Sequence, residues 1–191
     1  MDKHQKLSAI AALQSIGGVT LLETAASYSV AIFFGQAKDR NSINNGTIFF
    51  VDFGQGILGI TAAHVYKAYL DKKQNANFIC QIGGLRFNPE DHLIDVDYNL
   101  DIATFNIDRN IIIALNKQVH SPLNWPPKIM PKQGDDVFLA GFPAIYRAPS
   151  GKNDVEFGSA MHMLIVDSVN DRYIRCSYSE TIHITRGINT S

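Results

Sequence analysis

The sequence predicts a mainly β protein. Short runs rich in Val, Ile and Phe recur along the chain, and clusters of Gly, Asn, Asp and Pro separate them. Many short strands joined by turns are typical of an antiparallel sandwich or barrel. The chain has 191 residues, of which 46% are hydrophobic and 18% charged. This composition is typical of a folded protein that buries a sizeable core, not of a disordered one.

The expected elements follow from the pattern in chain order. A short helix is expected over 3–14, and it ends before the glycine pair Gly17 and Gly18. The expected strands are 28–35, 47–52, 57–62, 78–83, 102–107, 136–141, 163–169 and 173–177, with a further strand-like run at 181–185. Helices are expected at 65–73 and 109–116. The segment 121–132, with Pro122, Pro126, Pro127, Pro131 and the single Trp125, is the expected linker.

One glycine motif needs a choice between two structures. Gly54, Gly56 and Gly59 have the G-x-G-x-x-G spacing of dinucleotide-binding proteins. That motif works only where the glycines open a helix whose N-terminus receives the pyrophosphate. Here they lead into 57–61, which has the composition of a strand. We therefore expect a hairpin turn and no nucleotide cofactor.

A histidine and a carboxylate are the candidate site residues. His64 follows Thr61-Ala62-Ala63 at the end of an expected strand, and Asp101 stands at the head of another. A carboxylate beside an imidazole can orient it as a general base. Taken alone, each residue is more often structural. Asp95 and Asp97 are rivals for the carboxylate, but the small apolar pattern that follows Asp101 does not follow them.

These blocks together resemble the trypsin-like, chymotrypsin-fold serine proteases, especially their intracellular bacterial-type members. The similar segments are Gly46–Val51, Thr61–His64, Asp101–Ala103 and the run from Gly134 to Pro143. The resemblance covers roughly residues 30–143. It implies His64 and Asp101 as catalytic residues and a fold of two antiparallel barrels of the six-stranded type. The Gly141–Ala144 segment would then border the cleft.

The serine of that family has no counterpart in this sequence. The family carries it in a G-x-S-G turn, whose N–H groups also form the oxyanion hole. Ser159 lacks the following glycine, and Ser150 lacks the preceding one. The chain ends at Ser191, about where the family's nucleophile loop is expected to begin. We therefore expect a truncated domain, with an incomplete second barrel, that hydrolyses no peptide as given.

Charge and cysteine usage restrict the partners and the compartment. The formal net charge is -1 and the 17 basic residues are scattered, so no nucleic-acid partner is expected. Residues 7–16 contain Ser8, Gln14 and Ser15, which favours a short helix over a signal peptide. Two cysteines suit a reducing compartment, and a cytoplasmic location without membrane attachment is expected. A single Cys80–Cys176 bridge remains an alternative.

The other histidines are not spaced as metal ligands, so no metal site is expected. They are His4, His92, His120, His162 and His183.

The resemblance implies four segments. These are an N-terminal helical extension (1–27), a first barrel with His64 and Asp101 (28–120), a proline-rich crossover (121–132) and a second barrel (133–191).

Three functions remain open. In the first, the chain is the greater part of a serine endopeptidase that acts on a protein or peptide substrate. In the second, it is a protease-derived module that binds extended peptides by strand addition without cleaving them. In the third, it is an unrelated β-barrel domain.

Overall fold

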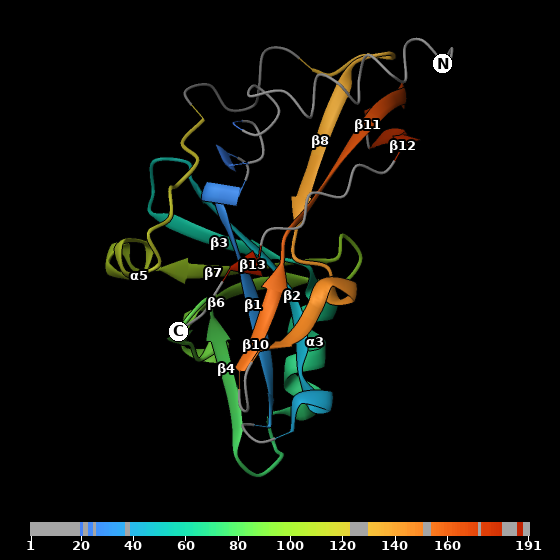
Figure 1. The fold of residues 1–191 in the computed structure, drawn as a ribbon. Coiled ribbons are helices and arrows are strands. Elements are labelled where there is room, and N and C mark those ends of the chain that lie inside the picture. The colour runs from blue at the N-terminus through green and yellow to red at the C-terminus, as the bar shows by residue number, and fades with distance from the viewer. Residues whose placement is uncertain are drawn as a thin grey trace.

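The computed structural model describes residues 20, 23–24, 26–36, 39–122, 130–150, 154–171, 173–180 and 187–188. The described chain is mainly β, and its paired strands are antiparallel, as the sequence predicts (Figure 1). The expected helix over 3–14, the strand-like run 181–185 and residues 123–129 of the expected linker lie outside the described residues.

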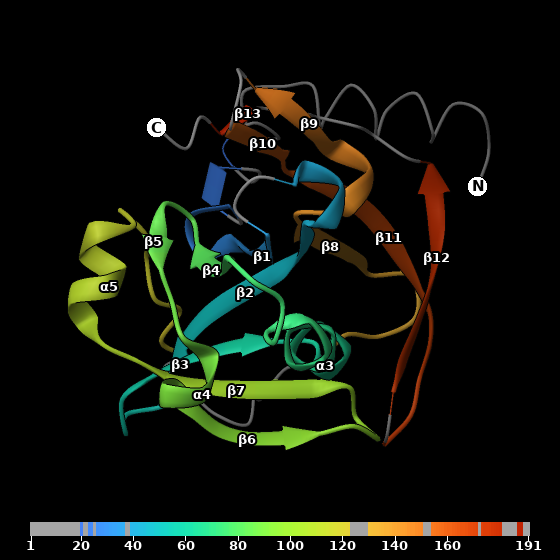
Figure 2. The same cartoon turned by 90° about the horizontal axis from the view of Figure 1, so that it is seen from below.

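The largest sheet among the described residues has seven strands in the order β5-β4-β1-β2-β3-β7-β6. Their bounds are β1 (Ser29–Gln36), β2 (Asn44–Asp52), β3 (Ile57–Thr61), β4 (Phe78–Ile82), β5 (Leu85–Arg86), β6 (Leu93–Asp97) and β7 (Ile102–Ile107). The two outer strands, β5 and β6, follow one another in the chain and are joined through the one-turn helix α4 (Pro89–His92). The sheet is strongly curled, which Figure 2 shows from below.

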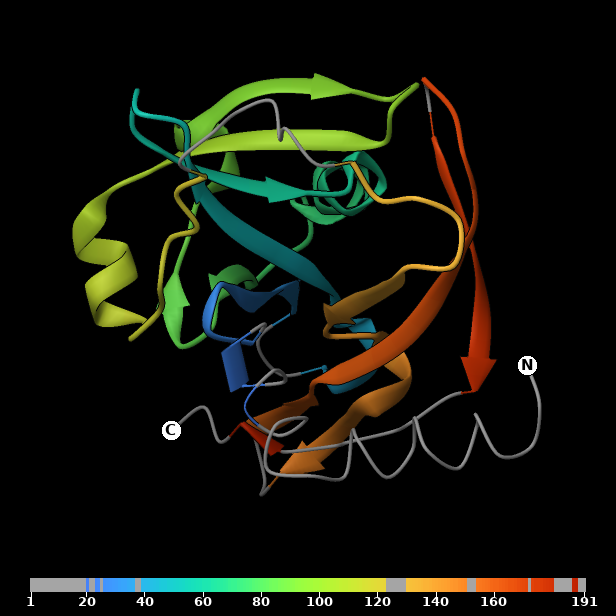
Figure 3. The same ribbon diagram turned by 90° about the horizontal axis from the view of Figure 1, so that it is seen from above.

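Two smaller sheets follow in the second half of the chain. One has the order β12-β11-β8 and the other β13-β10-β9. Their strands are β8 (Asp136–Gly141), β9 (Arg147–Ser150), β10 (Asp154–Gly158), β11 (Ala160–Val169), β12 (Ile174–Glu180) and β13 (Gly187–Ile188). Both sheets lie on one side of the seven-stranded sheet, next to β1 and β2 (Figure 3).

The strand β8 does not form a hairpin with the strand that follows it in the chain. Its partner is β11, and the β9–β10 hairpin is inserted between them. The physical reason lies just after β8, where Pro143 and the 3-10 turn η2 (Ala144–Tyr146) redirect the chain before it can fold back.

The strand β1 is buried on both faces, and it packs against a different core on each face. Val30, Ile32 and Phe34 face the main core, which the curled sheet encloses. Ala31 and Phe33, on the opposite face, belong to a second core with Phe142 and Phe157. Phe33 and Phe157 pack with ring centroids 4.6 Å apart. Two-sided burial explains why the sequence of β1 is a continuous apolar run without alternation.

The helices differ from expectation mainly at their ends. The helix α3 (Ala63–Lys72) begins two residues before the expected start at 65, and its Tyr66 and Tyr69 pack into the main core. The helix α5 (Arg109–Ala114) is shorter than expected. Asp108 caps it by accepting a hydrogen bond from the N–H of Asn110 at 2.7 Å.

The glycine motif forms a hairpin loop, so the predicted turn is confirmed. The loop joins the antiparallel strands β2 and β3. Gly54 and Gly56 have φ of +95° and +124°, which glycine adopts without strain. The Asp52 carboxylate accepts a hydrogen bond from the N–H of Gly54 at 2.7 Å and holds the loop.

The two cysteines do not pair, since Cys80 is a buried free thiol in β4 and Cys176 a half-buried one in β12. In the part of the chain that the structure describes, no helix is both long and apolar enough to cross a bilayer.

Candidate functional site

His64 lies in the first turn of a helix, not at the end of a strand as expected. It is the second residue of α3, with Ala62 at the N-cap. Just beyond β3, only the two small residues Ala62 and Ala63 separate His64 from Thr61. Ala63 is fully buried, whereas the His64 side chain is 72% exposed, so the helix start holds the backbone and presents the imidazole at the surface.

Asp101 lies in the turn that joins β6 to β7, immediately before β7. Its φ is +55°, in the left-handed region. Among residues with a side chain, Asp and Asn tolerate this conformation best, because their short polar side chains bond locally or to neighbours. The turn aims the carboxylate at the N-terminus of α3.

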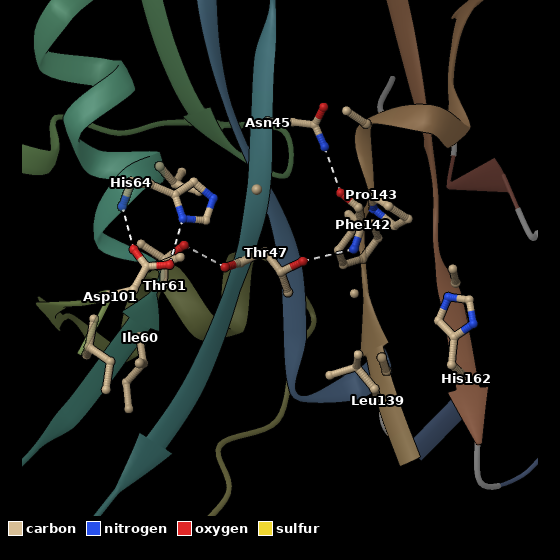
Figure 4. A pocket seen from close by; sticks show the side chains of 18 residues that line it. Asn45, Thr47, Ile60, Thr61, His64, Asp101, Leu139, Phe142, Pro143 and His162 are labelled. Carbon is tan, nitrogen blue, oxygen red and sulfur yellow. Dashed lines mark hydrogen bonds and ion pairs between the residues drawn. The ribbon is translucent and has the colours of Figure 1, made fainter. Parts of the chain in front are cut away.

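The two residues are joined by two hydrogen bonds. Oδ2 of Asp101 lies 2.7 Å from Nδ1 of His64, and Oδ1 accepts the backbone N–H of His64 at 2.9 Å. An ionised carboxylate can only accept, so Nδ1 carries the ring proton in the neutral imidazole. The second ring nitrogen, Nε2, points away from Asp101 toward the side of the pocket with Phe142 and Pro143 (Figure 4). An imidazole held this way can take a proton at Nε2.

The same hydrogen bonds stabilise the charged form of Asp101. The backbone N–H of His64 contributes most and its imidazole next, and together they lower the pKa of the Asp101 carboxyl below its ordinary value. Asp101 therefore stays ionised and keeps accepting both bonds.

A pocket of about 610 Å³ lies beside His64. One wall comes from β2, β3 and the start of α3, and the opposite wall comes from β8, the residues after it and β11 (Figure 4). Gly141, Phe142, Pro143 and Ala144 belong to the second wall, so the predicted position of this segment beside the pocket is confirmed. Seven further lining residues are apolar: Ile60, Ala62, Val65, Ile102, Leu139, Ala140 and Ala160.

Sequence reasoning missed three polar residues of this pocket. Asn45, at the start of β2, and His162, in β11, line it, and no motif pointed to either. Thr47 also lines it, although only its strand had been recognised. Alternation along β2 was the available signal, because residues two apart in a strand share a face.

A short series of hydrogen bonds connects the two walls. The Thr61 hydroxyl donates to the carbonyl of Thr47 at 2.7 Å. Thr47 Oγ1 in turn accepts the N–H of Phe142 at 2.8 Å. The side-chain amide of Asn45 donates to the carbonyl of Phe142 at 2.7 Å. Figure 4 shows these bonds running from the β3 side of the pocket to the β8 side.

The rival carboxylates bond nearby backbone N–H groups instead. Asp97 accepts the N–H groups of Asn99 and Leu100, and Asp95 accepts that of Val96. Ser159, one of the two serines weighed as a nucleophile, does not line the pocket. The side chain of Ser150, the other serine, lies outside the described part of the structure.

The other histidines are dispersed. His92 stacks on Phe87 with ring centroids 4.7 Å apart, and His120 meets Tyr28 edge to face. His4 and His183 lie outside the described residues. Within the described ranges, no three or more His, Cys, Asp or Glu residues gather as a metal-binding group.

Compared with known protein families and with curated protein sequences, the chain gives no significant match. A functional assignment therefore depends on the residues and the geometry of the pocket.

Proposed function

We propose that the chain is the His- and Asp-bearing part of a trypsin-like serine endopeptidase that hydrolyses peptide bonds. The observation that carries the proposal is the 2.7 Å contact between Asp101 Oδ2 and His64 Nδ1, at the edge of a pocket that Nε2 faces. In this proposal residues 28–120 form the first barrel, 121–132 the crossover, and 133–191 part of the second barrel. The consecutive outer strands β5 and β6 support a barrel-like first half.

Each residue has a defined role in the reaction. His64 takes the proton of a serine hydroxyl through Nε2 as the serine attacks the scissile carbonyl, and it returns that proton to the leaving amine. Asp101 keeps the proton on Nδ1 and stabilises the imidazolium.

The nucleophile is the part of the proposal that the described pocket does not supply. The residues that line the pocket in the described chain include no serine. Thr47 and Thr61 are the hydroxyl residues there, and both hydroxyls are engaged in hydrogen bonds between strands. The proposal therefore places the serine in a segment other than those that form these walls. The proposed substrate is a protein or peptide.

We also place the protein in the cytoplasm. The free thiols of Cys80 and Cys176 favour a reducing compartment.

The test uses the full-length natural protein and a fluorophosphonate probe, which reacts with an activated serine. Wild-type protein is expected to cleave fluorogenic casein and to take up the probe, and His64→Ala is expected to lose both. His92→Ala is the matched control, because that histidine stacks on Phe87 away from the pocket.

Cleavage that survives His64→Ala would overturn the proposal. Binding of an extended peptide by the wild-type protein without cleavage or labelling would favour the non-catalytic peptide-binding module instead.

A further inference from the structure

The strand β2 belongs to the same wall of the pocket as β3, and it is hydrogen-bonded both to β3 and to the opposite wall. At one end of the connection, Thr61 closes β3 three residues before His64, and its hydroxyl bonds the Thr47 carbonyl. At the other end, the Thr47 hydroxyl accepts the N–H of Phe142. A single residue, Thr47, therefore links the His64 wall to the Phe142 wall.

The backbone of Phe142 is held on both of its polar groups. Its N–H donates to Thr47 and its carbonyl accepts from Asn45. The residue is 3% exposed, and its ring packs in the second core with Phe33 and Phe157. Because the ring and both polar backbone groups are fixed, the position of this wall depends directly on Asn45 and Thr47.

The two walls approach closely at this point. A Cβ built on Gly141 would lie 2.8 Å from Thr47 Oγ1, closer than real Cβ atoms come. Glycine is therefore needed at 141 for the contact to form. The space between Gly141 and Thr47 therefore leaves no room for a methyl group.

We propose that Thr47 and Asn45 are positioning residues: through the Phe142 backbone they set the distance of the Gly141–Ala144 wall from the His64 imidazole. This inference rests on the proposed function, and it concerns residues that hold the proposed catalytic site in position. A reaction in which groups from both walls must meet is sensitive to their spacing, and a misplacement of about 1 Å can lower a rate about 10²-fold. The effect falls on the chemical step, so kcat changes more than KM.

The kinetic test compares variants of the full-length natural protein. Thr47→Val keeps the side-chain shape and removes the acceptor, whereas Thr47→Ser keeps the acceptor. We expect Thr47→Val to lower kcat about 10–100-fold with KM nearly unchanged, and Thr47→Ser to restore most of it. Asn45→Asp, which turns a carboxylate oxygen toward the Phe142 carbonyl, is expected to act like Thr47→Val. Thr104→Val is the control, because that hydroxyl bonds Asp95 outside the pocket.

A second measurement on the 191-residue chain does not depend on peptidase activity. In Thr47→Val, the Phe142 amide is expected to exchange its hydrogen faster, and the His64 Cε1–H signal is expected to shift in NMR spectra. Thr47→Ser should keep both close to wild type. If wild-type protein cleaves nothing, the proposed function fails, while this measurement still decides the role of Thr47. An unchanged His64 signal despite faster Phe142 exchange, or a lower thermal midpoint with unchanged kcat, would show a purely structural role and overturn the inference.

Discussion

The carboxylate of Asp101 receives two hydrogen bonds from the same residue, His64, one from the backbone N–H and one from Nδ1 of the ring. The backbone N–H can only donate, so the oxygen that faces it must remain an acceptor. This leaves a single group, the other oxygen, to determine which ring nitrogen carries the proton.

Asp101→Asn is therefore expected to reverse the tautomer of His64. The amide oxygen would keep the backbone N–H, so the NH₂ group would face Nδ1 and force the ring proton onto Nε2. In the 191-residue chain, ¹⁵N NMR of the neutral imidazole should show this exchange. Under the proposed function, the kcat of peptide hydrolysis is expected to fall about 10⁴-fold in this variant. Asp95→Asn is the control, and an unchanged tautomer in Asp101→Asn would contradict the prediction.

The same carboxyl links folding to pH. Its folded-state pKa is lowered, so Asp101 contributes stability above its unfolded-state pKa, and that contribution is lost as the pH falls through the folded-state value. The difference in unfolding free energy between wild type and Asp101→Asn should therefore be largest at neutral pH and shrink in acid. Urea titrations at several pH values measure it. Asp71→Asn, on the exposed side of α3, should run parallel to wild type, and a gap that widens in acid would refute the prediction.

The two thiols are expected to differ in reactivity. Burial raises the pKa of Cys80 to about 12, and the thiolate is the reactive form. Iodoacetamide should therefore label native Cys176→Ala only slowly, through opening of the sheet, and label native Cys80→Ala faster. Mass spectrometry after timed labelling measures both rates. Labelling in urea is the control, because both thiols are then exposed and the two variants should react at equal rates. Equal labelling rates of the two variants in the native state as well would contradict the burial of Cys80.

Gly46 and Gly84 form a matched pair for stability. A Cβ on Gly46 would lie 2.6 Å from a methyl group of the buried Val65 in α3, whereas one on Gly84 would meet nothing within 4 Å. We expect Gly46→Ala to destabilise the chain by about 1–3 kcal/mol. Gly84→Ala should stay within about 0.5 kcal/mol of wild type. Urea unfolding of the three proteins checks this, and equal midpoints would show that α3 shifts without cost.

Local pattern explains which strands could be predicted. The expected strands 102–107 and 136–141 agree with β7 and β8 because each is an apolar run bounded by turn residues. The segment with β5, α4 and β6 was missed. Two of its elements are very short, and β6 carries two carboxylates, Asp95 and Asp97. The strands β5 and β6 are defined by pairing with the adjacent strands β4 and β7 across short turns, and their own composition gives little signal.

The candidate site also has one part that the sequence predicts and one part that it does not. The contact between His64 and Asp101 could be predicted because two short motifs marked both residues. The hydrogen bonds that Asn45 and Thr47 make with Phe142 could not be predicted, because they join residues almost 100 positions apart. Alternation along β2 indicates that Asn45 and Thr47 share a face, but it does not indicate which segment that face bonds.

The left-handed backbone of Asp101 limits which substitutions position 101 can accept. Asn and Gly suit that conformation, so a saturation library is expected to keep them at normal protein abundance, while branched and bulky residues lower abundance. Only aspartate offers both the conformation and a carboxylate. Substitutions at position 101 would thus separate the requirement for folding from the requirement for activity. Comparing the abundance of each variant with its activity would measure the two requirements independently.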